Sequence, residues 1–277
     1  MVEQAFFFQN RSGDHLFGYQ HIPQNKGKTG IVFCHPFGEE KHRSYRSIVE
    51  FSRYLANNNV PSLRFDMRGS GDSDGDMVEA TVDSQVEDTL DAISLFIEKQ
   101  SLDQVVLIGL RYGAVIAALT ADQDTRVKAI VLLSPVIKGS IYWRELLRTR
   151  QLSSVSHNQK ATRSSELLEE LETNGQLEIE AQYVSQTFVS QLQKIDMSNH
   201  KPNFSGDILV CDLANDVINK ELSSKVIQQY SGKECYAEIY SEEERDYWSN
   251  LALYDQFYPD KTFEFSRSWL IKRGVLN

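Results

Sequence analysis

The sequence predicts an α/β fold with a mostly parallel central sheet, helices on both faces and an inserted helical cap. Short apolar runs alternate along the chain with longer segments of helical periodicity, which is the order that a parallel sheet with crossover helices requires. A polar, helix-prone segment interrupts this alternation once, between residues 138 and 200. A turn flanked by Gly109 and Gly113 joins one apolar run directly to the next helical segment.

The first half of the chain begins with a hairpin and continues with alternating strands and helices. Two strands flank the turn Arg11-Ser12-Gly13-Asp14, over residues 5–8 and 15–22. Runs typical of strands buried on both faces cover residues 30–34, 61–65, 105–108 and 127–133. Apolar residues at helical spacing predict helices over residues 43–57, 79–99 and 114–119.

The pattern changes after residue 137. The next segment is polar, its clearest helical pieces are residues 144–150 and 165–171, and no strand is predicted in it. Strands over residues 207–211 and 235–240 and a helix over 263–272 then resume the earlier order. We therefore expect residues 1–137 and 201–277 to form the α/β core. Residues 138–200 would form a helical cap over the sheet edge that carries the glycine-flanked turn.

The bulk composition excludes several classes of protein. Over 277 residues, the hydrophobic content of 41% and the charged content of 25% are those of a soluble globular protein. A net charge of -10 argues against nucleic acid or an anionic membrane surface as the main partner. No apolar run approaches the roughly 20 residues that span a bilayer, so we expect no membrane span. The three cysteines have no metal-type spacing. We expect reduced thiols in a cytoplasmic protein with no metal and no organic cofactor.

The turn Gly109-Leu110-Arg111-Tyr112-Gly113 has the strand–turn–helix context of the nucleophile elbow of α/β hydrolases, where the middle residue is Ser. The chain resembles that superfamily over nearly its whole length. The stretch Asp66-Met67-Arg68-Gly69-Ser70-Gly71-Asp72-Ser73 matches a loop of the family, and His35-Pro36-Phe37-Gly38 fills its oxyanion-loop position. The resemblance implies an α/β-hydrolase fold and, by family, a hydrolase.

A closer similarity is to the exosortase-A-associated hydrolase 2 group, which is linked to bacterial exopolysaccharide export. That group has a Pro-Phe-x-Glu-Glu loop, matched by residues 36–40, and a Gly-Leu-Arg-x-Gly elbow, matched by residues 109–113. This resemblance implies that arginine at the elbow is a feature of the group.

Two of the three members of the family's catalytic triad are absent. Arg111 stands where the nucleophile belongs, and its guanidinium offers only hydrogen-bond donors. The acid position falls on Asp216, with Asp212 as a second candidate. The histidine should follow the strand at residues 235–240, but none of the six histidines lies beyond His200. Because nucleophile and base act as a unit, the sequence argues against a conventional serine esterase or peptidase.

The first hypothesis for the site is an inactive or non-classical hydrolase that binds a small anionic or acyl ligand. Arg111 and Tyr112 begin a helix, whose free N–H groups and dipole favour an anion. The neighbouring loop would complete the ligand site with Phe37, Gly38, Glu39 and Glu40. Under an alternative interpretation, Glu39 or Glu40 turns inward and neutralises Arg111 in an internal ion pair.

The second hypothesis is an active esterase or acyltransferase that uses no serine. His35 would be a general acid or base, and Glu39, Glu40 or Asp216 would activate a water molecule. Arg111 would then stabilise a developing oxyanion. Four neighbouring residues receive structural roles. Lys41 is expected on a solvated helix face, Asp66 and Arg68 are expected to brace their loop, and Cys34 is expected to be a buried thiol.

Overall fold

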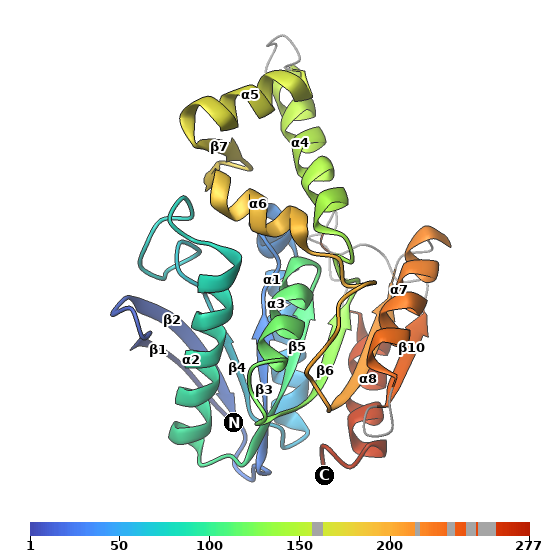
Figure 1. Ribbon diagram of the computed structural model, residues 1–277. Helices are drawn as coiled ribbons and strands as arrows, with labels where there is room; N and C mark the ends of the chain where they lie inside the picture. Colours follow the sequence, from blue (N-terminus) through green and yellow to red (C-terminus); the bar gives the residue numbers. More distant parts are fainter. Residues whose placement is uncertain (157–162, 214–216, 232–235, 242–247, 249–258) are drawn as a thin grey trace.

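The computed structural model describes residues 1–156, 163–213, 217–231, 236–241, 248 and 259–277 (Figure 1). In this part of the chain the central sheet has eight strands, in the order β1-β2-β4-β3-β5-β6-β9-β10. β1 pairs antiparallel with β2, and β2 with β4, whereas the pairs from β4 to β10 are parallel. The strand bounds are β1 Val2–Gln9, β2 His15–Ile22, β3 Thr29–Cys34, β4 Ser62–Phe65, β5 Gln104–Leu110, β6 Val127–Leu133, β9 Asp207–Asp212 and β10 Ala237–Ser241.

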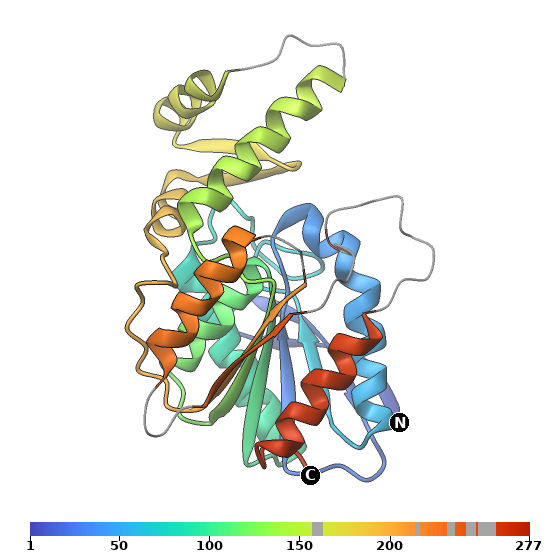
Figure 2. The same ribbon diagram turned by 90° about the vertical axis from the view of Figure 1, so that its right-hand side faces the viewer.

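Helices cover both faces of this sheet, as Figure 2 shows. One face carries α1 (Gly38–Asn57) and α8 (Asp260–Lys272), and the other carries α2 (Val82–Gln100), α3 (Tyr112–Ala121) and α7 (Val217–Tyr230). Strands β3, β5 and β6 lie in the middle and are buried almost throughout. Their unbroken apolar runs, rather than alternating ones, follow from this burial on both faces. The predicted α/β fold, with a mostly parallel central sheet and helices on both faces, is therefore confirmed.

Between β6 and β9 the chain leaves the sheet and forms the cap segment, which we define as residues 139–194. It lies beyond the carboxyl ends of the parallel strands (Figure 1) and comprises α4 (Gly139–Ser156), α5 (Ser164–Asn174), β7 (Gln176–Ile179), β8 (Gln182–Ser185) and α6 (Gln186–Lys194). Trp143, Leu171 and Phe188 are buried in the same apolar cluster as α2 and α3. The cap segment is therefore packed onto the core rather than held only by its two connections.

Local signals explain both ends of α2. Thr81 accepts a hydrogen bond from the Ser84 N–H and starts α2 as a capping box, and Ser101 ends that helix in a left-handed conformation. The prediction for the cap segment was incomplete, because the hairpin β7–β8 lies in a stretch where only helix was expected. Among the described helices, none is long and apolar enough to span a membrane.

Candidate functional site

The elbow has the backbone geometry that the glycine pattern predicts. β5 ends at Leu110, α3 begins at Tyr112, and Arg111 between them has φ 54° and ψ -118°. A positive φ in a residue other than glycine costs about 1–3 kcal/mol. Close packing explains both glycines: a Cβ at Gly113 would lie 2.1 Å from the carbonyl oxygen of Cys34, and one at Gly109 would lie 2.4 Å from that of Gly113. The turn therefore presents the Arg111 side chain at the carboxyl end of the sheet.

The Arg111 guanidinium forms an ion pair with Glu40. Its Nε donates to Glu40 Oε1 at 2.9 Å, and its Nη2 donates to Glu145 Oε2 at 3.3 Å. The side chains of Arg111 and Glu40 are 16% and 14% exposed, whereas that of Glu145 is 57% exposed. Glu39, the other carboxylate that the sequence offered, instead lies 3.7 Å from Arg43 on the same helix. The internal pair is therefore present, and Glu40 forms it.

Aromatic side chains enclose this ion pair. The Tyr142 hydroxyl donates to Glu40 Oε2 at 2.9 Å, so both oxygens of that carboxylate accept a hydrogen bond. The guanidinium also lies over the rings of Tyr142 and Trp248, at 5.5 and 6.0 Å from their centroids. Burial opposes the charge of Arg111, but Glu40, Tyr142 and Glu145 outweigh it and raise the pKa of Arg111. Burial, followed by Glu40, raises the pKa of Tyr142, which keeps its proton and its donor role.

Of the two candidates for the triad acid, Asp212 lies in the described part of the chain. Asp216 lies outside the described residues. Asp212 ends β9, is 4% exposed and accepts a hydrogen bond from Ser223 Oγ of α7 at 2.8 Å. The predicted position of the triad histidine is residues 241–248, of which 242–247 lie outside the described residues, and the sequence contains no histidine there.

His35 lies at the end of β3 and is 5% exposed. Its ring stacks on that of Tyr45, with centroids 6.1 Å apart and planes 20° apart. Burial, followed by the positive charge of Lys41, lowers the pKa of His35 to about 3. Such a histidine is neutral at pH 7, which makes it a poor general acid, and its low pKa makes it a weak base. Its environment therefore argues against the acid–base role considered for it.

Acid should destabilise the protein through its buried neutral histidines. Burial lowers the pKa of the fully buried His21 to about 4 and that of His35 to about 3, against 6.5 for a free histidine. Below about pH 6.5 these histidines bind protons in the unfolded chain but stay neutral in the folded protein. The free energy of unfolding therefore falls as the pH falls. We expect the two histidines together to lower the free energy of unfolding by about 2 kcal/mol between about pH 7 and pH 5.5. Urea unfolding curves would measure this loss.

A matched variant isolates the contribution of one histidine. His21→Asn should remove about half of the loss, because only His35 then remains to titrate in this way. An equal pH dependence in the variant and the parent protein would contradict this origin of the acid sensitivity.

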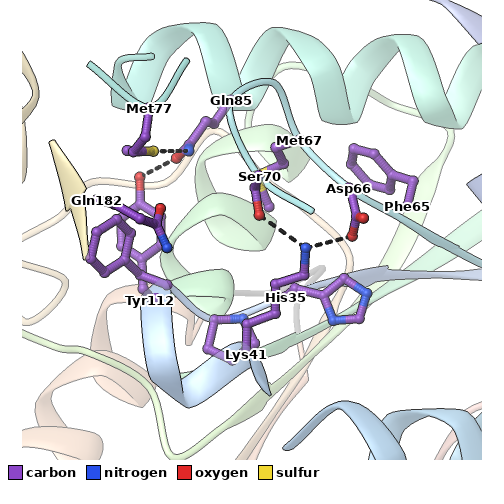
Figure 3. Close-up of a pocket in the computed structure, with 13 residues that line it drawn as sticks. His35, Lys41, Phe65, Asp66, Met67, Ser70, Met77, Gln85, Tyr112 and Gln182 are labelled. Carbon is purple, nitrogen blue, oxygen red and sulfur yellow. Dashed lines mark hydrogen bonds and ion pairs between the residues drawn. The ribbon is translucent and has the colours of Figure 1, made fainter. Parts of the chain in front are cut away.

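A pocket lies beside the elbow, bordered by β3, the start of α1 and the loop after β4 (Figure 3). It brings together four of the predicted site residues, His35, Phe37, Gly38 and Tyr112, whereas Arg111, Glu39 and Glu40 are not part of its lining. The other lining residues are Pro36, Lys41, Phe65, Asp66, Met67, Ser70, Met77, Gln85 and Gln182. The predicted site residues therefore fall into two adjacent groups, one around the ion pair and one around the pocket.

The polar side of the pocket centres on Lys41. Its ammonium lies 2.6 Å from Asp66 Oδ1 and donates to Ser70 Oγ at 2.9 Å (Figure 3). Lys41 is only 7% exposed, so the prediction that it lies on a solvated face was wrong. Asp66 is the residue that could have indicated the burial of Lys41. It directly follows β4, and its carboxylate faces the first turns of α1 and pairs with the Lys41 ammonium. On the opposite side, the Tyr112 hydroxyl donates to Gln85 Oε1 at 2.6 Å.

Asp66 and Arg68 were predicted to brace the loop after β4, and Cys34 was predicted to be a buried thiol. Arg68 donates to both carboxylate oxygens of Asp88, and the Asp72 N–H donates to Asp66 Oδ2, which shows the expected bracing of the loop. Cys34 is buried and unpaired, and burial raises the pKa of its thiol to about 12, so it is a core residue and a poor nucleophile. Within the described residues, no group of three His, Cys, Asp or Glu side chains is placed to hold a metal ion.

Several solved structures share this fold. Est1E from Butyrivibrio proteoclasticus, solved with ferulic acid, has a TM-score of 0.69 and 19% identity, with 97% of this chain and 99% of that chain covered. The α/β hydrolase GrgF from Penicillium sp. sh18 has a TM-score of 0.69 and 16% identity, with 99% of each chain covered. The esterase Pf2001 from Pyrococcus furiosus has a TM-score of 0.64 and 14% identity, with coverage of 98% and 91%. At these identities the similarity shows the fold.

No curated protein matches the sequence. A family model does: the one described as "Serine aminopeptidase, S33" matches residues 25–230, which is more than half of the chain. That span runs from the loop before β3 to the end of α7 and includes the elbow. The chain therefore belongs to this serine aminopeptidase (S33) family of the α/β-hydrolase superfamily.

Proposed function

We propose that this protein is a non-hydrolytic member of its family that binds a small anionic or acyl ligand at Arg111. The observation that carries the non-hydrolytic part of the proposal is the elbow arginine itself, which Glu40 holds at 2.9 Å. The ligand part depends on the second contact of Arg111, with the exposed Glu145. Arginine cannot attack a carbonyl carbon, and Glu40 fixes the orientation of the guanidinium. A chain with no histidine beyond His200 also lacks the base that the serine mechanism needs.

The second contact of Arg111 supports ligand exchange. Glu145 is more than half exposed and lies 3.3 Å from Nη2, so it makes a weaker and more accessible contact than Glu40 does. A ligand carboxylate or phosphate can replace Glu145 at this edge of the guanidinium while Glu40 keeps the other edge. Arginine suits this role because its planar fork donates two parallel hydrogen bonds to an oxyanion.

We also propose that the chain belongs to the exosortase-A-associated hydrolase 2 group and is associated with exopolysaccharide export. Support comes from the two motifs that suggested the group, because the Glu40 of one and the Arg111 of the other are partners in the same ion pair. A cytoplasmic location is part of the proposal, and the buried thiol of Cys34 fits a reducing compartment.

Titration with short carboxylates tests the binding proposal. We expect acetate, butyrate and octanoate to raise the melting temperature, and the matching alcohols to leave it unchanged. Glu145→Gln removes the competing carboxylate and should tighten binding about threefold. Arg111→Lys keeps the charge but loses the planar fork, and should weaken binding about tenfold. Calorimetry or thermal shift measures both changes.

Two results would contradict the proposal. Equal effects of carboxylates on the parent protein and on Arg111→Lys would show that the arginine does not bind them. Hydrolysis of p-nitrophenyl esters, or covalent labelling by a fluorophosphonate, would show an active enzyme instead. Hydrolysis that is lost on mutating His35 or Asp216, with no labelled serine, would favour the esterase or acyltransferase that uses no serine. A label that maps to a serine would instead show a serine nucleophile outside the elbow.

A further inference from the structure

The tip of the cap hairpin has an unusual backbone. β7 and β8 pair antiparallel, with Ile179 opposite Gln182, so Glu180 and Ala181 form a two-residue turn. Both have positive φ, 51° and 62°. Turns of this kind favour Asn-Gly, because most side chains clash with a left-handed backbone. The sequence therefore places two poorly suited residues at the tip.

Glu180 connects this tip to the core. Its Oε2 accepts a hydrogen bond from the Glu39 N–H at 2.8 Å, in the first turn of α1. Phe37, at the N-cap position of α1, provides no side-chain hydrogen bond, so Glu180 supplies the carboxylate that a helix start favours. A Cβ at Gly38 would lie 2.2 Å from Glu180 Oε2, so the close approach of the carboxylate requires glycine there.

The carboxylate is held against opposing forces. Glu39 and Glu40 lie in the same first turn of α1, and Glu180 is a third negative charge beside them. Burial raises the pKa of Glu180; the Glu39 N–H opposes this shift, and the charges of Glu40 and Glu39 add to it. The contact thus combines a favourable hydrogen bond and helix dipole with charge repulsion and turn strain.

The hairpin covers the pocket beside the elbow. Gln182, the first residue of β8, lies over it opposite the Lys41 and Asp66 side (Figure 3). Just after the hairpin, Phe188 of α6 stacks on Phe37, with ring centroids 5.7 Å apart. Movement of the hairpin away from α1 would remove Gln182 from the pocket and expose residues such as Met77, which is 3% exposed.

We propose that Glu180 is a latch that holds the β7–β8 hairpin closed over this pocket by binding the first turn of α1. Release of the carboxylate lets the hairpin swing away and opens the pocket from the cap side. The contact between Glu180 and the Glu39 N–H then controls access to the pocket. The proposal concerns cap opening alone and does not depend on the identity of a ligand.

Hydrogen–deuterium exchange of the full chain tests the latch without any ligand. Glu180→Ala should raise exchange about tenfold in the hairpin and at residues 37–41, because the carboxylate contact and its helix-dipole interaction are lost. Ala181→Gly is the matched control, since it relieves strain in the same turn and keeps the carboxylate. It should leave exchange at residues 37–41 unchanged or lower.

A chemical probe measures pocket opening directly. Met77→Cys places a thiol on the pocket wall, and peptide-level mass spectrometry after maleimide labelling distinguishes it from the native cysteines. Adding Glu180→Ala should speed this labelling about tenfold, whereas adding Ala181→Gly should not. Identical labelling rates with and without Glu180 would overturn the latch.

A second variant separates the latch from hairpin stability. Glu180→Asn combined with Ala181→Gly gives the turn its preferred residues but removes the long carboxylate. The latch predicts faster labelling of Met77→Cys in this well-formed hairpin. If only Glu180→Ala speeds labelling and this double variant does not, Glu180 merely stabilises the turn and the proposal is wrong.

Discussion

Glu40→Ala is expected to lower the free energy of unfolding by about 3 kcal/mol. The substitution leaves the Arg111 guanidinium, 16% exposed, without its principal partner, and the exposed Glu145 cannot replace a carboxylate that also binds Tyr142. The penalty is that of a largely buried charge left uncompensated, which exceeds the net contribution of the ion pair itself. Urea unfolding followed by circular dichroism measures the loss.

The adjacent residue provides the control. Glu39→Ala removes a carboxylate from the same helical turn, but one that is 39% exposed and 3.7 Å from Arg43, so it should cost under about 1 kcal/mol. Replacing both partners, with Arg111→Met and Glu40→Leu, should recover most of the stability because no charge is then left buried. Equal losses for Glu39→Ala and Glu40→Ala would show that the pair at the elbow has no special role.

Gly113→Ala should cost about 3 kcal/mol or more, because the added methyl group meets backbone rather than a movable side chain. Its Cβ would lie 2.1 Å from the carbonyl oxygen of Cys34 and 2.6 Å from that of His35. Relief requires α3 to move away from the end of β3, which disturbs the centre of the sheet. The melting temperature should fall correspondingly.

Gly27→Ala is the matched substitution in open space. No atom lies within 4 Å of its Cβ position, so it should leave stability within about 1 kcal/mol of the parent protein. A similarly small loss of stability in Gly113→Ala would contradict the close contact between the start of α3 and the end of β3.

The sequence predicts the core of the fold because apolar runs and helical periodicity coincide there. β3, β5 and β6 are buried on both faces, and unbroken apolar runs are found in few other settings. The hairpin β7–β8 has no such signal. Its strands have four residues each, and its turn is Glu180-Ala181 rather than a sequence typical of hairpins. Packing on the rest of the cap, rather than local preference, decides that structure.

For the site, the sequence identifies the position of Arg111 and narrows its partner to two residues. Adjacent residues of a helix point about 100° apart, so only one of Glu39 and Glu40 can face the elbow, and the placement of α1 decides which. The pocket is harder to predict, since Gln85 and Gln182 are brought to Tyr112 from distant parts of the chain. The burial of Lys41 likewise depends on a loop that lies apart from it in the sequence.

The positive φ of Arg111 also limits what backbone strain can indicate about chemistry. In a serine hydrolase, a strained elbow exposes the attacking oxygen, and such strain often guides the search for an active site. Here the same distortion persists with a residue that cannot attack, and it directs a cation toward two carboxylates. A survey that located catalytic centres by strained residues would select this position, although its side chain is not a nucleophile. The side chain, and not the strain, decides which reactions such an elbow supports.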